Sequence, residues 1–511
     1  MKAFLWILFL LQAFDIYLQE DKLVFLYTHF RHGARAPLAI NDSFIDKLGE
    51  RWTNPGELTG VGQRMHYLLG RRNRIRYIND GNTFLSSQFD PHEILIYSSN
   101  INRTMVSVSS QLQGFYPQNS QTGQTLTEQQ IKIAYPRVNV NYDEINSSIS
   151  DLGTSALPYQ MTLAPVRMVN DNDRKMNVYD LEECIEERDD IKKKNAETKP
   201  ELIEYIKQFN QKYNISFNKY FQDSNGEFDV FELNDICDAF LSNYWDDRTM
   251  SDFKQKTGLN FTELNDDCFE FFRMYYLYCF HGDEEKALAH VDSSGLMREL
   301  IYFMKRRIDA DITPINEDSN YKDYSRPKMV MRSGHDSTVS ADLILLIKAL
   351  GLNETDIYDF PKYASQLAIE VRTYKTITSS STYSDYNVIG YFDDKQIFNA
   401  TADEFIKKLE SEIWSDSKVN QFCGFDETTN NDTKTNSTTN TNTEEDDSDN
   451  AKTAYKVLMI IFICLAAIFI ATTIFLAYSL SKLKNSKPPI DPNFDANKST
   501  VTEGPFKNNI K

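Results

Sequence analysis

Three short apolar segments, each followed directly by charged or polar residues, constrain the fold of this chain most. They lie at 23–27, 94–97 and 328–332, and their length and composition are typical of buried strands. Stretches with helical periodicity follow them at 59–72, 102–113 and 339–350. This alternation predicts an α/β fold, a three-layer sheet with helices on both faces. Ligands of such sheets bind beyond the carboxyl ends of the strands, so the residues that follow the three segments are candidate site residues.

The first segment leads into a histidine between two arginines, Arg31, His32 and Arg35. Two guanidinium groups can each bind phosphate oxygens through paired hydrogen bonds. An unprotonated imidazole between them can attack phosphorus as a nucleophile. Gly33 permits a tight turn after the strand, and Pro37 prevents the strand from continuing. The sequence therefore predicts a phosphoryl-transfer site at the end of this strand.

These residues resemble the first sequence block of the histidine acid phosphatases, a branch of the histidine phosphatase superfamily. Residues 98–104 are similar to the second block of that family, and this similarity implies that Arg103 is a third phosphate ligand. Residues 331–337 are similar to its His-Asp block. The implied roles there are phosphate binding for His335 and proton donation by Asp336 as the general acid.

The resemblance extends from about residue 23 to about residue 422, in the order that the family has. It implies a phosphoglycerate-mutase-like fold with an inserted helical cap, and hydrolysis of phosphate monoesters through a covalent phosphohistidine. A bound phosphate should raise the pKa of Asp336, while the neighbouring arginines keep His32 unprotonated. We therefore expect an acidic pH optimum.

We expect neither a metal ion nor a cofactor. His29 and His32 are three residues apart at the first strand, so their side chains should point to opposite faces of the sheet. Apart from His335, the remaining histidines are scattered without the spacing of metal ligands. They are His66, His92, His281 and His290.

Both ends of the chain predict secretion and membrane anchoring. Residues 1–18 contain one lysine and then an apolar run, which is typical of a signal peptide. Residues 457–480 carry no charge and would span ~36 Å as a helix, enough to cross a bilayer. Lysines follow this run, so residues 481–511 should form a cytoplasmic tail. This predicts a single-pass protein whose catalytic domain is lumenal, in a lysosome-like vesicle, or extracellular at the cell surface.

The part between these segments divides further. We expect an α/β core at 19–167 and 291–423, a helical cap at 168–290 and a disordered stalk at 424–456, rich in Thr, Asn, Asp and Glu. Several Asn-X-Ser/Thr sequons predict a glycoprotein. They begin at Asn41, Asn146, Asn214, Asn260, Asn353, Asn399, Asn431 and Asn436, and one at Asn102 lies too close to the site to be modified.

Five cysteines precede the apolar run of the membrane segment, which allows at most two disulfides and leaves the pairing open. We favour bridges inside the region 184–279.

The formal net charge of −19 argues against nucleic acid as a partner, because a basic surface is missing. It also favours small phosphomonoester substrates over highly phosphorylated ones. A homodimer is possible. Two alternatives stay open, a catalytically inactive surface receptor of the same fold and a phosphatase specialised for sugar or inositol phosphates.

Overall fold

The computed structural model describes residues 21–38, 52, 54–79, 84–118, 124–134, 146–169, 195, 197–217, 228–246, 255, 258–280, 288–314 and 326–423. Contacts divide the chain into one compact unit that ends at Thr429 and a second unit beyond it. The predicted signal peptide, stalk, membrane segment and tail all lie outside the described residues. Within the described part of the chain, no helix has both the length and the apolar character needed to cross a bilayer.

The core of the first unit is a mixed sheet of seven strands in the order β3-β2-β4-β1-β5-β6-β7. β1, β2, β3 and β4 are parallel, whereas β5, β6 and β7 pair in antiparallel fashion. The strands are β1 (Lys22–Arg31), β2 (Ile94–Ser98), β3 (Arg167–Met168), β4 (Met329–Gly334), β5 (Gln366–Thr373), β6 (Asn387–Phe392) and β7 (Lys395–Thr401). The three strands predicted from the apolar segments are β1, β2 and β4.

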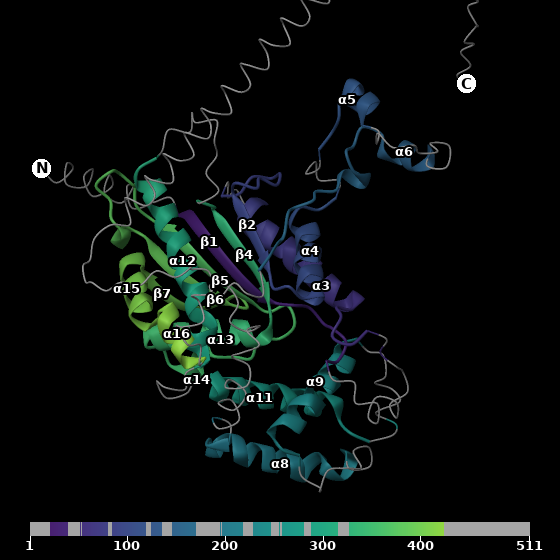
Figure 1. Cartoon of the computed structure of the whole chain (residues 1–511), viewed down its shortest axis with the longest axis vertical. Helices are drawn as coiled ribbons and strands as arrows, with labels where there is room; N and C mark the ends of the chain where they lie inside the picture. Colours follow the sequence, from purple (N-terminus) through teal and green to yellow (C-terminus); the bar gives the residue numbers. More distant parts are fainter. Residues whose placement is uncertain are drawn as a thin grey trace, which may run out of the picture. The chain divides into compact units, whose positions relative to one another are not determined.

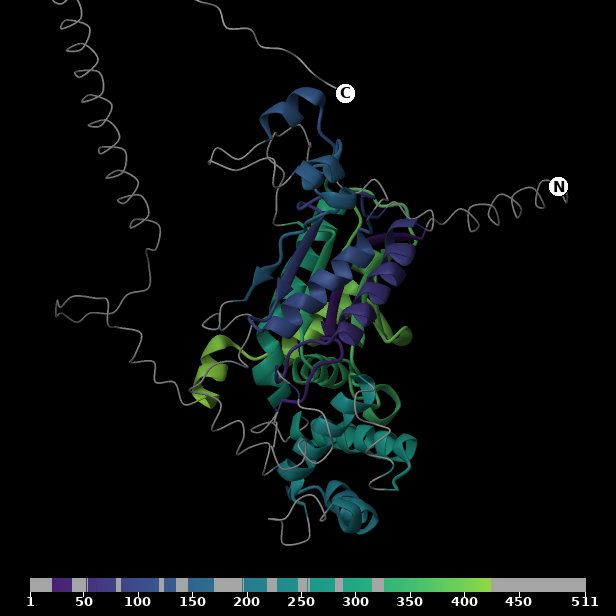
Figure 2. The ribbon, with the colours of Figure 1, turned by 90° about the vertical axis from the view of Figure 1, so that its right-hand side faces the viewer.

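Helices cover both faces of this sheet, as predicted (Figure 1). α3 (Gly60–Arg74) and α4 (Asn102–Phe115) pack together over one face, which is turned toward the viewer in Figure 2. The opposite face carries α12 (Leu288–Ile312), α13 (Asp336–Leu350) and α15 (Ala402–Glu412). The α/β architecture with three layers is therefore confirmed.

Successive side chains of each strand point to opposite faces of the sheet, so the sheet separates two hydrophobic clusters. Met329 and Met331 of β4 belong to the cluster that includes Leu112 of α4, whereas Val330 between them packs into the cluster on the other face. A register shift in β1 between Leu23 and Phe25 adds one residue to the strand. Because of this β-bulge, Leu23 and Leu26 share a face although they are three residues apart.

Between β3 and α12 the described elements are helices (Figure 1). They are α8 (Pro200–Phe217), α9 (Val230–Asp246) and α11 (Phe261–Phe280). A disulfide between Cys237 and Cys268 joins α9 to α11, inside the region where we expected bridges. Cys423 is also disulfide-bonded, which lies outside the favoured region and corrects that part of the prediction. The boundaries of the helical region as a separate domain stay a prediction.

The remaining described elements are short and lie in the connections and near the end of the unit. They are η1 (Ile75–Asn79), α5 (Glu128–Ile133), α6 (Asn146–Leu152), η2 (Pro158–Gln160), α14 (Glu354–Ile357), η5 (Tyr383–Asp385) and α16 (Asp416–Phe422).

The topology brings four chain segments to one edge of the sheet. β1, β2 and β4 are parallel, so the residues that follow them emerge at the same edge. β5 runs antiparallel to β1, so the residues that precede β5 reach that edge as well. The amide of Ala364 donates to the carbonyl of His32 at 3.1 Å, and the amide of His32 donates to the carbonyl of Gly334 at 3.0 Å. The backbone of His32 is thus held from both sides.

Candidate active site

The six predicted site residues lie together at this edge. Arg31 is the last residue of β1, Asp336 begins α13, and Arg103 lies in the first turn of α4. The side chains of Arg31, His32, Arg35 and His335 are buried, each with 5% or less of its surface exposed. Three cationic side chains lie around two imidazoles and one carboxyl group, so the site is locally positive inside an acidic protein.

The imidazole of His32 is fixed in one tautomer. Its Nδ1 lies 2.8 Å from the carbonyl oxygen of Gly33. Because a carbonyl oxygen can only accept, Nδ1 carries the proton and Nε2 keeps its lone pair. Burial first of all, and then the charges of Arg31, Arg35 and Arg103, hold the pKa of His32 well below its ordinary value. The ring is therefore neutral in mild acid and can act as a nucleophile.

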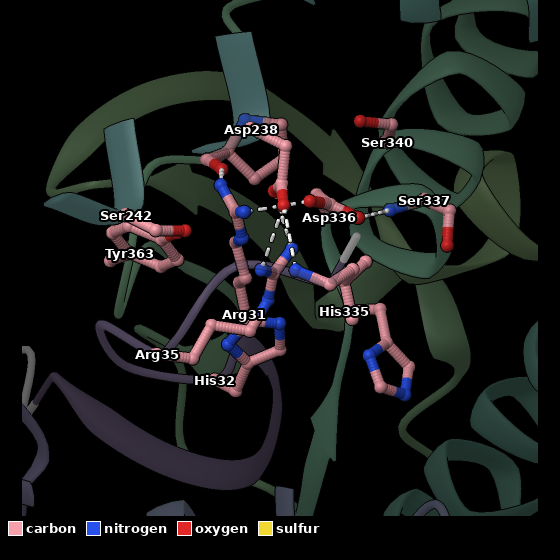
Figure 3. A network of polar contacts seen from close by, with 12 residues as sticks. Arg31, His32, Arg35, Asp238, Ser242, His335, Asp336, Ser337, Ser340 and Tyr363 are labelled. Carbon is pink, nitrogen blue, oxygen red and sulfur yellow. Dashed lines mark hydrogen bonds and ion pairs between the residues drawn. The ribbon is translucent and has the colours of Figure 1, made fainter. Parts of the chain in front are cut away.

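Arg31 is held between a carboxylate and an aromatic ring. Its Nη2 lies 2.7 Å from Oδ2 of Asp336 (Figure 3). Its Nη1 donates to the carbonyl of Pro361 at 2.8 Å. The guanidinium lies 4.3 Å from the ring centre of Tyr363. Its Nε–H is buried and has no hydrogen-bond partner among the described residues. A buried, unpaired cationic donor is costly unless an anion satisfies it.

Arg35 is held by a residue that the sequence did not predict, Asp238 of α9 (Figure 3). Nη1 of Arg35 lies 3.1 Å from Oδ2 of Asp238, and Nη2 lies 2.7 Å from Oδ1. Burial alone would lower the pKa of Arg35, but the charge and hydrogen bonds of Asp238 outweigh it and raise that pKa. Its Nε–H is also buried without a partner in the described part of the chain.

His335 and Arg103 form the third part of the site. Nη2 of Arg103 lies 3.3 Å from Nδ1 of His335, and Nε2 of His335 lies 2.9 Å from the hydroxyl of Ser99. Since arginine can only donate, Nδ1 of His335 accepts and Nε2 carries the proton. Burial and then the charge of Arg103 lower the pKa of His335 to about 3. The ring lies 5.6 Å from that of His32, measured between ring centres.

The pKa of Asp336 lies below its ordinary value. Burial raises its pKa, but the charges of Arg31 and Arg35 act more strongly together with His335, and the net shift is downward. The amide of Ser337 in the first turn of α13 donates to Oδ1 at 2.8 Å, which also favours the carboxylate. The raised pKa that we expected refers to a phosphate-bound site, and the protein without phosphate has the opposite shift.

The other described histidines have structural partners. His29 points to the α13 side of the sheet, where its Nδ1 lies 2.7 Å from Asp342 and its Nε2 lies 3.2 Å from Thr338. Elsewhere, Nδ1 of His66 lies 3.2 Å from Oε1 of Gln111. In the ranges that the structure describes, no three His, Cys, Asp or Glu side chains gather as metal ligands would. His281 lies outside those ranges.

The sequence analysis assigned no role to two further residues of the site, Tyr363 and Ser99. Tyr363 lies in the segment before β5, which the family resemblance includes, but no chemical pattern singled it out. Ser99 follows β2 and needed the structure to pair it with His335.

Comparison with known proteins gives the family. A sequence model described as the histidine phosphatase superfamily (branch 2) matches residues 22–388, which is most of the chain. The chain belongs to the histidine phosphatase superfamily. The predicted family is thereby confirmed, and with it the fold that this resemblance implies.

Individual relatives in the superfamily align over shorter stretches. Lysosomal acid phosphatase of Xenopus laevis is 33% identical over 99 residues, 19% of this chain and 22% of the relative. Testicular acid phosphatase of Homo sapiens is 38% identical over 104 residues, 20% of this chain and 24% of the relative. The chain thus aligns with less than a third of the length of these relatives. Among solved structures, the phytase from Citrobacter braakii superposes with a TM-score of 0.48 at 13% identity, covering 79% of this chain and 99% of the phytase.

Proposed function

We propose that this member of the histidine phosphatase superfamily is an acid phosphatase that hydrolyses phosphate monoesters through a covalent phosphohistidine. The observation that carries the proposal is the state of His32. Its Nδ1–H is bound to the Gly33 carbonyl, so the lone pair of Nε2 is available beside three arginines. A neutral, oriented imidazole in a cationic pocket is what in-line attack on a phosphate dianion requires.

The phosphate is bound by the arginines. The buried, unpaired Nε–H groups of Arg31 and Arg35 support this role, since a phosphate oxygen would satisfy each of them. Arg103 completes the set of donors. His335 would join it by turning the Nε2–H that now reaches Ser99 toward the phosphate. As the reaction proceeds, charge on the transferred phosphoryl group spreads over its equatorial oxygens, and these donors stabilise it there.

The reaction then has two steps. In the first, a bond forms between Nε2 of His32 and phosphorus while the bond from phosphorus to the alcohol oxygen breaks, and this oxygen takes the proton of Asp336. In the second, a water oxygen attacks phosphorus, its proton passes to the Asp336 carboxylate, and the bond to His32 breaks. Inorganic phosphate leaves, and both residues return to their starting states.

Phosphate binding itself can prepare the general acid. Without phosphate, Arg31 neutralises Asp336 at 2.7 Å and lowers its pKa. A phosphate dianion competes for the donors of Arg31 and adds a negative charge beside the carboxyl group. Both effects raise the pKa of Asp336, so the proton arrives when the substrate does. This accounts for activity in acid.

Small phosphomonoesters are the proposed substrates. Asp238 places a carboxylate next to the phosphate-binding Arg35, and the net charge of −19 disfavours polyanions. The relatives named acid phosphatases agree with this choice. An inactive receptor would not need the unpaired donors of two buried arginines, and a phosphatase for inositol phosphates would need further cations around the site.

We also propose a lumenal or extracellular position, with residues 1–18 as signal peptide, 424–456 as stalk, 457–480 as the membrane helix and 481–511 as tail. The helical region 168–290 would form the cap between two parts of the core. The described disulfide agrees with an oxidising compartment. The side chains of Asn260, Asn353 and Asn399 are exposed, as glycosylation requires.

Hydrolysis of an aryl phosphate tests the proposal. The purified full-length chain is assayed from about pH 3.5 to 8 in EDTA, beside the His32→Ala variant. Turnover that is highest in acid, resists EDTA and is lost in the variant is the expected result. A folded, inert wild type would favour the receptor instead, and faster turnover of phytate than of the aryl phosphate would favour an inositol phosphatase.

A further inference from the structure

The hydrogen bonds of Arg35 leave one edge of its guanidinium group open. An arginine has five N–H donors in a plane. Nη1 uses both of its hydrogens, one on the carbonyl of Ala36 at 3.0 Å and one on Oδ2 of Asp238. Nη2 uses one on Oδ1 of Asp238. Among the described residues, nothing pairs with the buried Nε–H or with the second hydrogen of Nη2 beside it. These two donors form the edge that can bind two oxygens of one phosphate.

Asp238 itself is fixed from several directions. The backbone amide of Leu38 donates to its Oδ2 at 3.1 Å. Its neighbour Cys237 is tied to Cys268 of α11, so α9 cannot turn freely about its axis. One turn further along α9, the hydroxyl of Ser242 lies 3.2 Å from that of Tyr363, whose ring packs on Arg31. The carboxylate is therefore held where it meets the guanidinium of Arg35.

We propose that Asp238 is a positioning residue for phosphate binding: it grips one edge of Arg35 so that the Nε/Nη2 edge is presented to the phosphate. Asp238 does not touch the reacting atoms. It keeps a long, flexible side chain in one orientation, so that less conformational entropy is lost when phosphate binds. This role rests on the proposed function, and it assigns to the helical region a direct part in holding the phosphate site.

The test is the affinity for inorganic phosphate in Asp238→Asn. The amide keeps the size of the side chain but loses the charge and one of the two acceptor oxygens. We expect the inhibition constant of inorganic phosphate and the KM for an aryl phosphate to rise together, by about 10- to 100-fold. Asp238→Glu keeps both oxygens on a longer chain and should give values between those of the wild type and Asp238→Asn.

A double-mutant cycle shows whether Asp238 acts through Arg35. Lysine in Arg35→Lys is a point charge without a planar edge. In that background Asp238→Asn should change the inhibition constant by less than about threefold. An equally large effect in both backgrounds would mean that Asp238 acts elsewhere. A lower inhibition constant in Asp238→Asn would mean that Asp238 competes with phosphate. An unchanged inhibition constant would mean that Asp238 has no role in phosphate binding. Either result overturns the proposal.

Asp235→Asn is the matched control, because it makes the same change on an exposed position of the same helix. It should leave the inhibition constant of phosphate and the KM unchanged.

If Asp238→Asn does not fold, the test is made with Asp238→Glu. An inhibition constant of Asp238→Glu equal to that of the wild type then overturns the proposal. Calorimetric binding of phosphate needs no turnover, so it tests Asp238 even in an inert enzyme. If the wild type hydrolyses the aryl phosphate and the Asp238 variants bind phosphate equally well, only the role of Asp238 is rejected. If the wild type binds no phosphate, the phosphatase function is rejected as well.

Discussion

Three buried histidines with different partners have different chemistry. His32 donates through Nδ1 to a backbone carbonyl and keeps Nε2 available. His335 has the opposite arrangement, since Nδ1 accepts from Arg103 and Nε2 donates to Ser99. His29 pairs with the carboxylate of Asp342 on the other side of the sheet. Of the three, only His32 lies between the arginines with an unprotonated nitrogen that has no partner in the described part of the chain. The hydrogen-bond partners of the two ring nitrogens thus determine which histidine can act as a nucleophile.

Replacement of the general acid should matter most for poor leaving groups. In Asp336→Asn the alcohol oxygen has no proton donor, so we expect kcat for an alkyl phosphate to fall by about 10²- to 10⁴-fold. Nitrophenolate leaves without a proton, so the loss for nitrophenyl phosphate should be much smaller. Because the acid must be protonated, wild-type kcat should also decrease as the pH rises through the pKa of bound Asp336. Steady-state kinetics with both substrates check this, and equal losses would exclude proton donation by Asp336.

Among individual residues, the sequence predicted the site residues that directly follow a strand and missed those that distant parts of the chain contribute. Arg31, His32 and Arg35 follow one strand, and local chemistry singled them out. Asp238 lies on a helix about 200 residues later, and one acidic residue among many on an amphipathic helix gives no signal. The downward shift of the Asp336 pKa also depends on the distance to Arg31, which only the fold determines.

The two helices that cover one face of the sheet pack with glycines at their crossing. A Cβ on Gly70 of α3 would lie 1.9 Å from the carbonyl oxygen of Gln111 in α4, and one on Gly114 of α4 would lie 2.0 Å from the carbonyl oxygen of Tyr67. The backbones therefore touch, and no side chain fits between them. Since α4 also carries Arg103, this contact positions part of the phosphate site.

Alanine at either glycine should separate the helices. We expect Gly70→Ala and Gly114→Ala each to lower the free energy of unfolding by about 1–3 kcal/mol, because backbone atoms must move to relieve the overlap. Gly60→Ala is the control, since no atom lies within 4 Å of its added Cβ. It should be neutral or slightly stabilising. Urea unfolding measures all three, and a stability of Gly70→Ala equal to that of Gly60→Ala would contradict the close contact.

The sequence pattern was sufficient to predict α3, α4 and α13 to within a few residues. It could not predict the crossing of α3 and α4, since a glycine in a helical pattern has no fixed meaning without its neighbour. The β-bulge near Val24 was also out of reach. The run 23–27 is apolar throughout, so no alternation in it indicated where the register changes.

The molecule as a whole should lose stability in acid, although we propose that it works there. Burial lowers the pKa of His66 to about 4 and, together with nearby charges, that of His335 to about 3. The unfolded chain takes up these protons near pH 6.5, so folding is opposed increasingly as the pH falls from there to the folded pKa. His66 alone should account for about 2 kcal/mol of the loss between pH 7 and pH 5.

His66→Asn tests this linkage. The asparagine side chain does not titrate, so the decrease in unfolding free energy from about pH 7 to pH 5 should be about 2 kcal/mol smaller than in the wild type. Urea unfolding at the two pH values gives both differences. Identical pH dependence in the two proteins would mean that His66 has the same pKa in the folded and the unfolded state.

The central position of β1 has a consequence for how the chain is made. β1 is the first strand of the sheet to be synthesised, yet its two neighbours are β4 and β5, which begin at Met329 and Gln366. Both edges of an almost wholly buried strand therefore stay unpaired until more than 300 further residues have left the ribosome. Such an apolar edge is a target for aggregation, and its long-range pairing is slow. The sheet can close around β1 only after β5 has been synthesised, so an unshielded nascent chain is exposed to aggregation until then.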